Sequence, residues 1–364
     1  MSDGQILRLA ELIRSRFAAQ LVGAMPDPAV IVGPEGRVAA ANKPALDLLP
    51  ALKIDDPFVL ALRAPDIVDA HRRVMASGDA ETVQWSERVP VERLFDVCVA
   101  PLAATEGEVV ATLLTLRDLT ESRQVERMRV DFIANASHEL RTPLASLLGF
   151  IETLQGSARD DPKARDRFLK IMREQGRRMA RLIEDLLSLS RIEQKQHVRP
   201  DTIVDFAQTT RSVVESLTPM ATDLGVEIRL DAMGPAPVIG DKDELLRVAE
   251  NLIENAIKYG MRADTDGSGL VEVAVAMTDK EASLTVRDYG DGIAPEHLPR
   301  LTERFYRIDA GQSRAKNGTG LGLAIVKHIL TRHRGRLTIT SRLNQGSCFI
   351  ATVPLPQRPY SQSS

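Results

Sequence analysis

The chain has 364 residues, 27% of which are charged, and a formal net charge of only −3. This length allows two or three domains with hydrophobic cores of their own, and the balanced charge excludes a global positive field that would attract nucleic acid. No stretch approaches the roughly 18 apolar residues of a membrane-spanning helix. We therefore expect a cytoplasmic protein, associated with a membrane only if an anchor segment lies outside this sequence.

The two cysteines, Cys98 and Cys348, are far apart in the sequence and stand in apolar, strand-like surroundings. They form neither a disulfide framework nor a metal-ligand spacing, which fits a reducing compartment. They are therefore interpreted as small core residues.

Residues 1–22 predict an amphipathic helix, because apolar positions between Ile6 and Leu21 alternate with charged ones. The pattern has neither the layout of a signal peptide nor the length of a membrane span. Two interpretations stay open: a helix that caps or dimerises the following domain, and a helix that lies on a membrane surface.

Residues 23–120 alternate short strands with short helices. Strands are expected at Ala29–Val32, Val38–Ala40, Thr82–Val89, Leu94–Pro101 and Val109–Leu116, and helices at Asn42–Leu49 and Pro65–Ser77. This order resembles an α/β sensor domain of the PAS type. No paired His or Cys indicates haem or flavin, and Trp85 and Phe95 are interpreted as core residues. A small-molecule ligand or a regulatory protein therefore stays open as the partner of this domain.

Residues 121–197 predict two long helices. In the first, from Glu121 to Leu154, apolar or small residues recur every three or four positions, at Met128, Phe132, Ala136, Leu140, Leu144, Leu147, Ile151 and Leu154. His138 lies about 200° from this stripe and is expected to point to solvent. Glu139 follows it, Thr142 lies one turn further on, and Pro143 is expected to bend the helix.

The second helix begins near Pro162 and carries a stripe of its own. Its members at three- and four-residue spacing are Phe168, Ile171, Met172, Gln175, Met179, Leu182, Ile183, Leu186 and Leu189. Two amphipathic helices cannot bury both stripes alone. We therefore expect an antiparallel two-helix hairpin that forms a four-helix bundle in a homodimer.

The motif in the first of these helices, Ser137-His138-Glu139-Leu140-Arg141-Thr142-Pro143 within Asp131–Leu144, resembles the phospho-acceptor motif of sensor histidine kinases. Its continuation through Ser146–Leu154 is similar to the phosphate-regulon subfamily of these sensors. The resemblance implies that His138 accepts a phosphoryl group.

Residues 198–357 form the last predicted domain, of α+β class, and a disordered tail is expected over residues 358–364. Helices are expected at Ile203–Met220, Asp243–Lys258 and Leu321–Arg332. Strands are expected at Val226–Leu230, Val238–Ile239, Val271–Met277, Ala282–Arg287, Arg336–Ser341 and Ser347–Val353. The last two strands flank Asn344-Gln345-Gly346, which is a hairpin signal.

Two polar motifs in this domain suit a nucleotide. Asn251 and Asn255 lie one turn apart on a helix, where amide oxygens can contact Mg²⁺ and phosphate, and Lys258 adds a positive charge. Asp288-Tyr289-Gly290-Asp291-Gly292-Ile293 combines a carboxylate that can accept from an exocyclic amine with glycines that let the backbone approach a flat base. Taken singly, the first motif is equally a polar helix face and the second a plain turn.

A glycine string, Gly318-Thr319-Gly320-Leu321-Gly322-Leu323, opens the last helix, whose backbone amides can meet phosphate. It is weak as a Rossmann signature, because it follows a loop rather than a first strand. Together with Arg304-Phe305-Tyr306-Arg307 and the two polar motifs, however, it resembles the N, G1, F and G2 boxes of the Bergerat ATP-binding fold, an α/β sandwich.

This second resemblance implies that the matching residues bind ATP and Mg²⁺. Asn251 and Asn255 would bind Mg²⁺ and phosphate, Lys258 would bind phosphate, and Asp288 would bind the adenine amine. The residues implied beside the base and the phosphates are Tyr259, Gly290, Gly292, Ile293, Gly318, Thr319, Gly320, Leu321 and Gly322. A lid over Pro299–Asn317 would bring Arg307, Arg314 or Lys316 to the γ-phosphate.

The whole pattern predicts an ATP-dependent protein-histidine kinase, a homodimeric two-component sensor. Its similarity to the phosphate-regulon subfamily implies a role in phosphate starvation. His138 would take a phosphoryl group from ATP, with Glu139 as general base, and pass it to an aspartate of a response-regulator receiver domain. Glu139 and Thr142 also match the Glu-x-x-Thr pattern of sensor histidine kinases, and this resemblance implies that Thr142 orients a water that dephosphorylates the regulator. Two alternatives stay open: a chaperone-, mismatch-repair- or topoisomerase-type ATPase, and a non-enzymatic PAS-dimer scaffold.

Overall fold

The computed structural model describes residues 16–87, 93–105, 108–195, 197–232, 234–260, 269–308 and 318–356. The chain divides into two compact units, Met1–Asp131 and Phe132–Ser364. Within the described ranges, no helix is both long enough and apolar enough to span a membrane. Several sequence predictions lie outside these ranges: residues 1–15, Arg88 and Val89, Arg314 and Lys316 of the lid, and the tail over 358–364.

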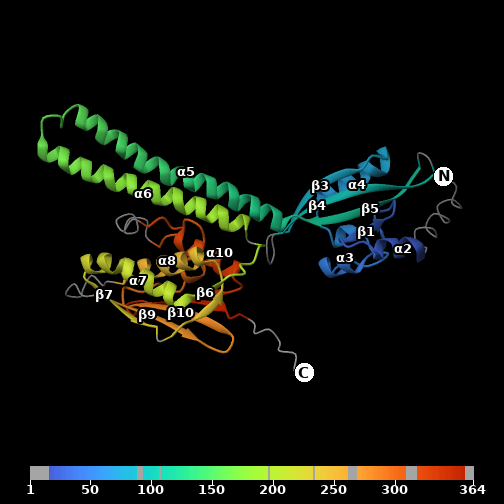
Figure 1. The fold of residues 1–364 in the computed structure, drawn as a ribbon. Coiled ribbons are helices and arrows are strands. Elements are labelled where there is room, and N and C mark those ends of the chain that lie inside the picture. The colour runs from blue at the N-terminus through green and yellow to red at the C-terminus, as the bar shows by residue number, and fades with distance from the viewer. Residues whose placement is uncertain are drawn as a thin grey trace, which may run out of the picture. The chain divides into compact units, whose positions relative to one another are not determined.

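The first unit is built on an antiparallel sheet with the strand order β2-β1-β5-β4-β3 (Figure 1). Strands β1 to β5 cover Ala29–Val32, Val38–Ala41, Glu81–Glu87, Arg93–Thr105 and Glu108–Asp118. Helices α2, α3 and α4 cover Arg16–Gly23, Lys43–Leu48 and Pro65–Ser77, and a 3-10 turn, η1, covers Phe58–Leu60. The strands and helices expected between Ala29 and Leu116 are confirmed, and η1 is an addition to them.

Local side-chain chemistry sets the helix ends in this unit. The Asn42 side chain accepts hydrogen bonds from the backbone N–H groups of Ala45 and Ala29, both at 2.9 Å, so it caps α3 and ties it to β1. Gly78 ends α4 in the left-handed region, with φ of 78°. The start of α3 and the end of α4 are therefore each determined by one residue in the sequence.

Aromatic side chains in this unit belong to its core, as predicted. Phe95 is 1% exposed, and Trp85 stacks on it with ring centroids 5.2 Å apart. The cysteines differ from their prediction, because Cys98 and Cys348 are both half-buried. The residues on either side of each cysteine face the core. Because side chains alternate between the two faces of a strand, each cysteine lies on the opposite face.

The hairpin expected from the sequence consists of α5, Thr120–Gln155, and α6, Pro162–Gln194, which lie side by side (Figure 1). The Asp161 side chain accepts from the backbone N–H groups of the first turn of α6 and caps it. Near the turn of the hairpin, the rings of Phe150 and Phe168 stack with centroids 5.2 Å apart. Helix α5 continues through Pro143, and the bend expected there stays a prediction.

The remainder of the second unit is a mixed five-stranded sheet with the order β11-β12-β10-β9-β7, in which β7 and β9 are parallel. Strands β7 and β9 to β12 cover Val226–Asp231, Gly269–Met277, Glu281–Asp288, Arg336–Arg342 and Gly346–Pro354. Helices α7, α8 and α10 cover Phe206–Asp223, Lys242–Tyr259 and Gly322–Arg332, and a 3-10 turn, η2, covers Leu298–Arg300. Strands β6, Ile203–Asp205, and β8, Pro237–Ile239, pair separately.

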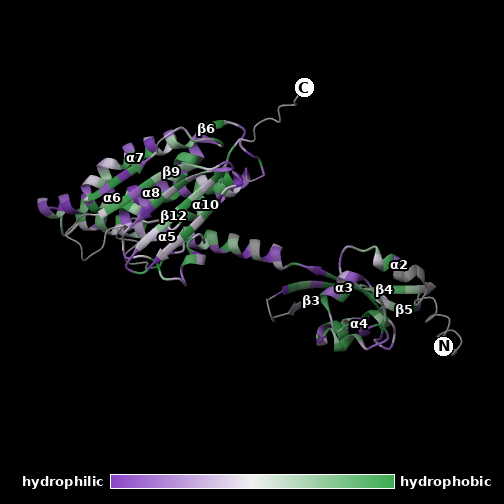
Figure 2. Ribbon diagram, turned by 90° about the horizontal axis from the view of Figure 1, so that it is seen from below, coloured by the Kyte–Doolittle hydropathy of each residue, from purple (hydrophilic) through white to green (hydrophobic). Residues whose placement is uncertain are grey.

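The core of this α/β sandwich lies between the sheet and its helices, where the hydrophobic residues of α10 and the strands appear green in Figure 2. Leu252 of α8, Ile325 of α10 and Val286 of β10 have no exposed surface. Leu182 and Leu189 of α6 belong to the same cluster. Burial of apolar side chains therefore attaches α6 to the sandwich as well as stabilising the sandwich itself.

One predicted helix began too early. The expectation of a helix over Ile203–Met220 was wrong at its start, because Ile203 and Val204 pair with β8 and α7 begins only at Phe206. The Asp205 side chain accepts from the backbone N–H groups of Ala207 and Gln208 and caps the helix. The physical reason for this error is that the two paired strands are far apart in the sequence. The local periodicity of apolar residues contains no information about such pairing.

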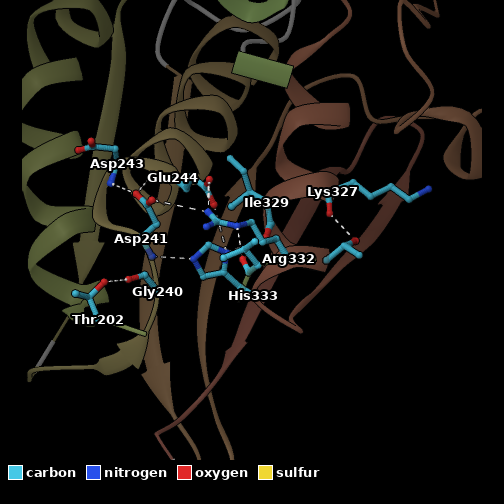
Figure 3. A network of polar contacts seen from close by, with 11 residues as sticks. Thr202, Gly240, Asp241, Asp243, Glu244, Lys327, Ile329, Arg332 and His333 are labelled. Carbon is cyan, nitrogen blue, oxygen red and sulfur yellow. Dashed lines mark hydrogen bonds and ion pairs between the residues drawn. The ribbon is translucent and has the colours of Figure 1, made fainter. Parts of the chain in front are cut away.

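A polar network joins the end of α10 to the start of α8 and to the segment that precedes the sandwich (Figure 3). Arg332 pairs with Glu244, and its Nε donates to the backbone oxygen of Val198 at 2.9 Å. His333 is 1% exposed, and its Nε2 accepts from the backbone N–H of Asp241 at 3.0 Å. Burial lowers the pKa of His333, which favours the neutral ring that this bond requires.

Candidate functional site

His138 is exposed on α5, as the sequence predicted. Thr142, one turn further along, is also exposed, and its hydroxyl donates to the backbone oxygen of His138 at 3.2 Å. The imidazole and the hydroxyl therefore lie on the same side of the helix. A ring nitrogen of an exposed imidazole can act as a nucleophile.

Glu139, beside this histidine, is held by two arginines. Its Oε2 accepts from Arg178 of α6 at 3.0 Å and from Arg307 of the sandwich at 3.2 Å. The Arg307 side chain is only 8% exposed, and that of Arg178 12%. Arg307 was expected at a γ-phosphate, and in this structure it contacts the acceptor helix instead. It therefore joins the sandwich to the residue adjacent to His138.

The polar face of α8 contains the predicted amides and one carboxylate that the prediction missed. The side-chain amide of Asn251 donates to the backbone oxygen of Arg247 at 2.8 Å, and Asn255 is half-buried on the same helix. Lys258 does not stand alone, because its Nζ lies 2.6 Å from Oε1 of Glu254. This i, i+4 spacing is visible in the sequence and could have revealed the pair.

Asp288 ends β10 almost completely buried, at 4% exposure. Its Oδ1 accepts from the backbone N–H groups of Gly290 and Ser347, both at 3.1 Å. Burial raises the pKa of Asp288, and these two hydrogen bonds oppose part of that effect. A carboxylate fixed in this way can accept a hydrogen bond from an exocyclic amine.

The glycines after Asp288 are required by close packing of the protein itself. A Cβ on Gly290 would lie 2.1 Å from the backbone oxygen of Tyr259, and one on Gly292 would lie 2.0 Å from that of Arg342. Gly292 also has φ of 68°. The loop that ends with Ile293 is therefore in close contact with the end of α8 on one side and with the β11–β12 hairpin on the other.

The glycine string leads into the N-terminus of α10, at Gly322. A Cβ on Gly322 would lie 2.4 Å from the side-chain oxygen of Asn251, so α10 approaches α8 as closely as only glycine permits. Gly320 has φ of 73°, and its backbone oxygen accepts from the N–H of Phe305 at 2.8 Å. Gly318, Thr319 and Leu321 complete the string, and Leu321 is fully buried. Helix α8 thus adjoins both the glycine string and the loop after β10.

This arrangement fits Mg²⁺ and a nucleotide by the chemistry of its donors. Two amide side chains, a lysine and the backbone amides at the N-terminus of α10 are groups that can bind Mg²⁺ and phosphates. The buried carboxylate of Asp288, at the end of β10, is a group that can accept a hydrogen bond from a base.

Helix α6 contributes residues that the sequence analysis missed. Asp185 is 8% exposed and contacts both Arg247 and Thr319, while Arg181 lies 3.1 Å from Glu254. The only signal in the sequence is that Asp185 adjoins the apolar stripe of α6, where a charge is unusual.

Three domain families match successive parts of the chain. Residues 22–124 match the PAS fold, residues 128–195 match the His Kinase A (phospho-acceptor) domain, and residues 240–357 match the histidine kinase-, DNA gyrase B- and HSP90-like ATPase. The phospho-acceptor match includes His138, and the ATPase match includes all of the polar motifs described above.

Two curated relatives are sensor proteins. The chain is 40% identical over 237 residues to the phosphate regulon sensor protein PhoR of Pseudomonas aeruginosa, a match that covers 65% of this chain and 52% of that protein. It is 29% identical over 340 residues to the sensor protein SrrB of Staphylococcus aureus, covering 93% of this chain and 55% of that protein. The chain therefore spans about half the length of these relatives.

A solved structure shares the fold over most of the chain. It is the crystal structure of histidine kinase ThkA in complex with response regulator protein TrrA, with a TM-score of 0.50 at 20% identity. The match covers 93% of this chain and 98% of that one. At this identity the likeness concerns the fold alone.

Proposed function

We propose that this chain, which has the domain composition of a PhoR-like sensor histidine kinase, is an ATP-dependent protein-histidine kinase that phosphorylates itself on His138. A ring nitrogen of His138 would attack the γ-phosphorus of ATP, the bond to the β-γ bridging oxygen would break, and ADP would leave. The observation that carries the proposal is the contact between Glu139, the neighbour of His138, and Arg307, which precedes the glycine string. It brings acceptor helix and nucleotide motifs into one compact unit.

The residues of the sandwich would bind ATP in the roles that their chemistry suits. Asp288 would accept from the adenine amine, and Asn251 and Asn255 would hold Mg²⁺ together with the phosphate oxygens. Mg²⁺ would neutralise charge on the phosphates during transfer. Lys258 and the amides at the start of α10 would bind the phosphates directly.

Glu139 would act as general base toward the other ring nitrogen of His138. Both arginines bind its Oε2. Oε1 is therefore the oxygen that we assign to the ring proton. The same two arginines hold Glu139 in position.

We further propose that the phosphorylated histidine passes its group to an aspartate of a response-regulator receiver domain, in a cytoplasmic homodimer with the domain limits 23–120, 121–197 and 198–357. The dimer is supported by apolar residues of α5 and α6 that a single chain leaves exposed, among them Leu144, Leu148, Leu169, Ile183 and Leu187. A role in phosphate starvation is supported by the identity to PhoR. The PAS domain would supply the signal through a ligand or a regulatory protein.

The direct test is incubation of the purified chain with γ-labelled Mg-ATP, beside His138→Ala and Asn255→Asp. The proposal expects an acid-labile label on the wild type, as a phosphoramidate gives, and none on either variant. A label that persists on His138→Ala would place the acceptor elsewhere. Absence of label on a wild type that binds ATP would reject the kinase.

Phosphatase activity toward the regulator is the second candidate function, favoured by the position of the Thr142 hydroxyl on the same face as His138. Thr142→Ala should slow dephosphorylation of a phosphorylated receiver domain by at least tenfold while leaving the rate of autophosphorylation within about twofold, since its hydroxyl orients water only in the first reaction. The two rates are measured on the same preparation. Equal loss of both would reject this division of labour.

The alternative of a non-kinase ATPase is separated by the same labelling experiment. The ATPase family that matches residues 240–357 includes gyrase B- and HSP90-like proteins, so this domain alone does not decide between hydrolysis and transfer. The match of residues 128–195 to a phospho-acceptor domain favours transfer. Release of phosphate without labelled protein would favour the alternative.

A further inference from the structure

Asp185 of α6 uses both of its carboxylate oxygens on the nucleotide motifs. Oδ1 accepts from Nη2 of Arg247 at 2.7 Å, and Oδ2 accepts from the hydroxyl of Thr319 at 2.8 Å. Arg247 lies on α8 one turn before Asn251, whose side chain it holds through its backbone oxygen. Thr319 belongs to the glycine string, and both it and Asp185 are 8% exposed.

The contact of Asp185 with Arg247 and Thr319 is buried and specific, unlike an exposed ion pair on the surface. A carboxylate taken out of water is stable only where donors compensate it, and Asp185 has a guanidinium on one oxygen and a hydroxyl on the other. Its neighbours Leu182 and Leu189 are buried in the core cluster of the sandwich. The position of the carboxylate is therefore determined from both sides.

A second contact of α6 acts on the same motif. One turn before Asp185, Nη1 of Arg181 lies 3.1 Å from Oε1 of Glu254, and that oxygen lies 2.6 Å from Nζ of Lys258. The Thr319 hydroxyl, in the glycine string implied beside the phosphates, is thus bound to a carboxylate of α6. The Lys258 ammonium is bound to Glu254, a carboxylate of its own helix that Arg181 of α6 also contacts. ATP would bring further negative charge to the same place.

We propose that Asp185 is a positioning residue that holds the nucleotide motifs docked on α6, through Thr319 and Arg247, and that this contact competes with ATP phosphates for Thr319. The inference rests on the proposed function, because it requires that the glycine string binds ATP. Coupling of this kind is reciprocal: removing the Asp185 charge strengthens nucleotide binding, and nucleotide binding releases α6. The docked state then restrains the kinase until ATP occupies the site.

The test compares Asp185→Asn with Glu184→Gln in the full chain. Asparagine keeps the shape but removes the charge that opposes phosphate. Glu184 is the matched control, since it is the preceding residue, is 75% exposed and lies 3.9 Å from the same arginine. The probe is Mg²⁺ with the non-hydrolysable analogue AMPPNP, titrated by calorimetry. We expect Asp185→Asn to bind AMPPNP about tenfold more tightly than the wild type, and Glu184→Gln within about twofold.

A merely structural role for Asp185 predicts the opposite sign, because a damaged site binds nucleotide more weakly. Hydrogen exchange adds a second readout: AMPPNP should speed exchange of α6 amides around Asp185 in the wild type, and in Asp185→Asn that exchange should be fast already. A wild type that binds AMPPNP, with Asp185→Asn no tighter, overturns this inference and leaves the proposed function standing. A wild type that does not bind AMPPNP overturns both.

Discussion

Glu139 is one of the residues at which the acceptor helix contacts the segment before the glycine string, and Phe132, with its ring centroid 5.8 Å from that of Phe305, is another. Changing Glu139 to Gln removes the proposed base but keeps the shape and an acceptor oxygen for Arg178 and Arg307. We expect autophosphorylation to slow by about 100-fold, because general base catalysis contributes on that scale. The initial rate of acid-labile labelling measures it, with AMPPNP affinity as the check that the nucleotide site is intact.

The matched control for this prediction is Glu152→Gln, an exposed carboxylate on the same helix, which should label at the wild-type rate. If Glu139→Gln labels as fast as the control, the carboxylate is structural and another group takes the proton.

Asp288 is the residue from which we expect a pH dependence of nucleotide binding. Because burial raises its pKa, this carboxyl takes up a proton at a higher pH than an ordinary Asp, and an uncharged carboxyl is a weaker hydrogen-bond acceptor for the adenine amine. We expect AMPPNP affinity of the wild type to fall on acidification. Asp288→Asn should bind about 10- to 100-fold more weakly at neutral pH, with little further loss in acid.

Titration of AMPPNP at several pH values tests this prediction, with Asp291→Asn as the control. Asp291 is exposed in the same loop and is expected to leave both the affinity and its pH dependence unchanged. An unchanged pH profile in Asp288→Asn would assign the dependence to another group.

At the scale of elements, α8 and α10 meet at two places. Gly322 at the start of α10 meets Asn251 in the middle of α8, and His333 after the end of α10 accepts from the backbone of Asp241 before the start of α8 (Figure 3). The second contact requires an unprotonated nitrogen. The stability of the sandwich therefore depends on the neutral form of His333.

The sign of this dependence follows from the lowered pKa of His333. Above about pH 6.5, the pKa of a histidine in the unfolded chain, both states are neutral and the stabilisation is fully present. As the pH falls from there to the folded pKa, the unfolded chain binds a proton that the native state does not, and stability is lost. The wild type should lose about 1 kcal/mol per pH unit more than His333→Gln in this window.

Urea unfolding of wild type and His333→Gln at neutral and acidic pH measures the difference. Comparing the two chains cancels the contributions of the other histidines, among them His71 and His328, whose pKa values burial also lowers. Parallel loss of stability in both chains would show that His333 does not titrate in this window.

At the scale of the whole molecule, the hairpin leaves part of its apolar surface uncovered. Leu148 is 54% exposed in the single chain, on the helix that carries His138. If a second hairpin covers it, Leu148→Glu places a charge in an apolar interface and should convert the dimer to a monomer. Light scattering at micromolar concentration gives the mass. Leu224→Glu, a similarly exposed position on the sandwich at 42%, is the control and should stay dimeric.

The sequence by itself determined most elements and the types of residue in the site. The helix Pro65–Ser77 was predicted to the residue, because a proline begins it, a glycine ends it and its apolar period is local. The exposed position of His138 followed in the same way from the angular spacing of one helix. These features depend on neighbours within a few residues, and a sequence records such neighbours directly.

Only the tertiary structure decided which groups meet. Asp185 contacts Thr319 across 134 residues and Arg247 across 62, and Glu139 meets Arg307 across 168. The start of α7 was misplaced for the same reason, since Ile203 pairs with Ile239. No periodicity encodes such contacts, because they arise only when buried apolar faces bring distant segments together.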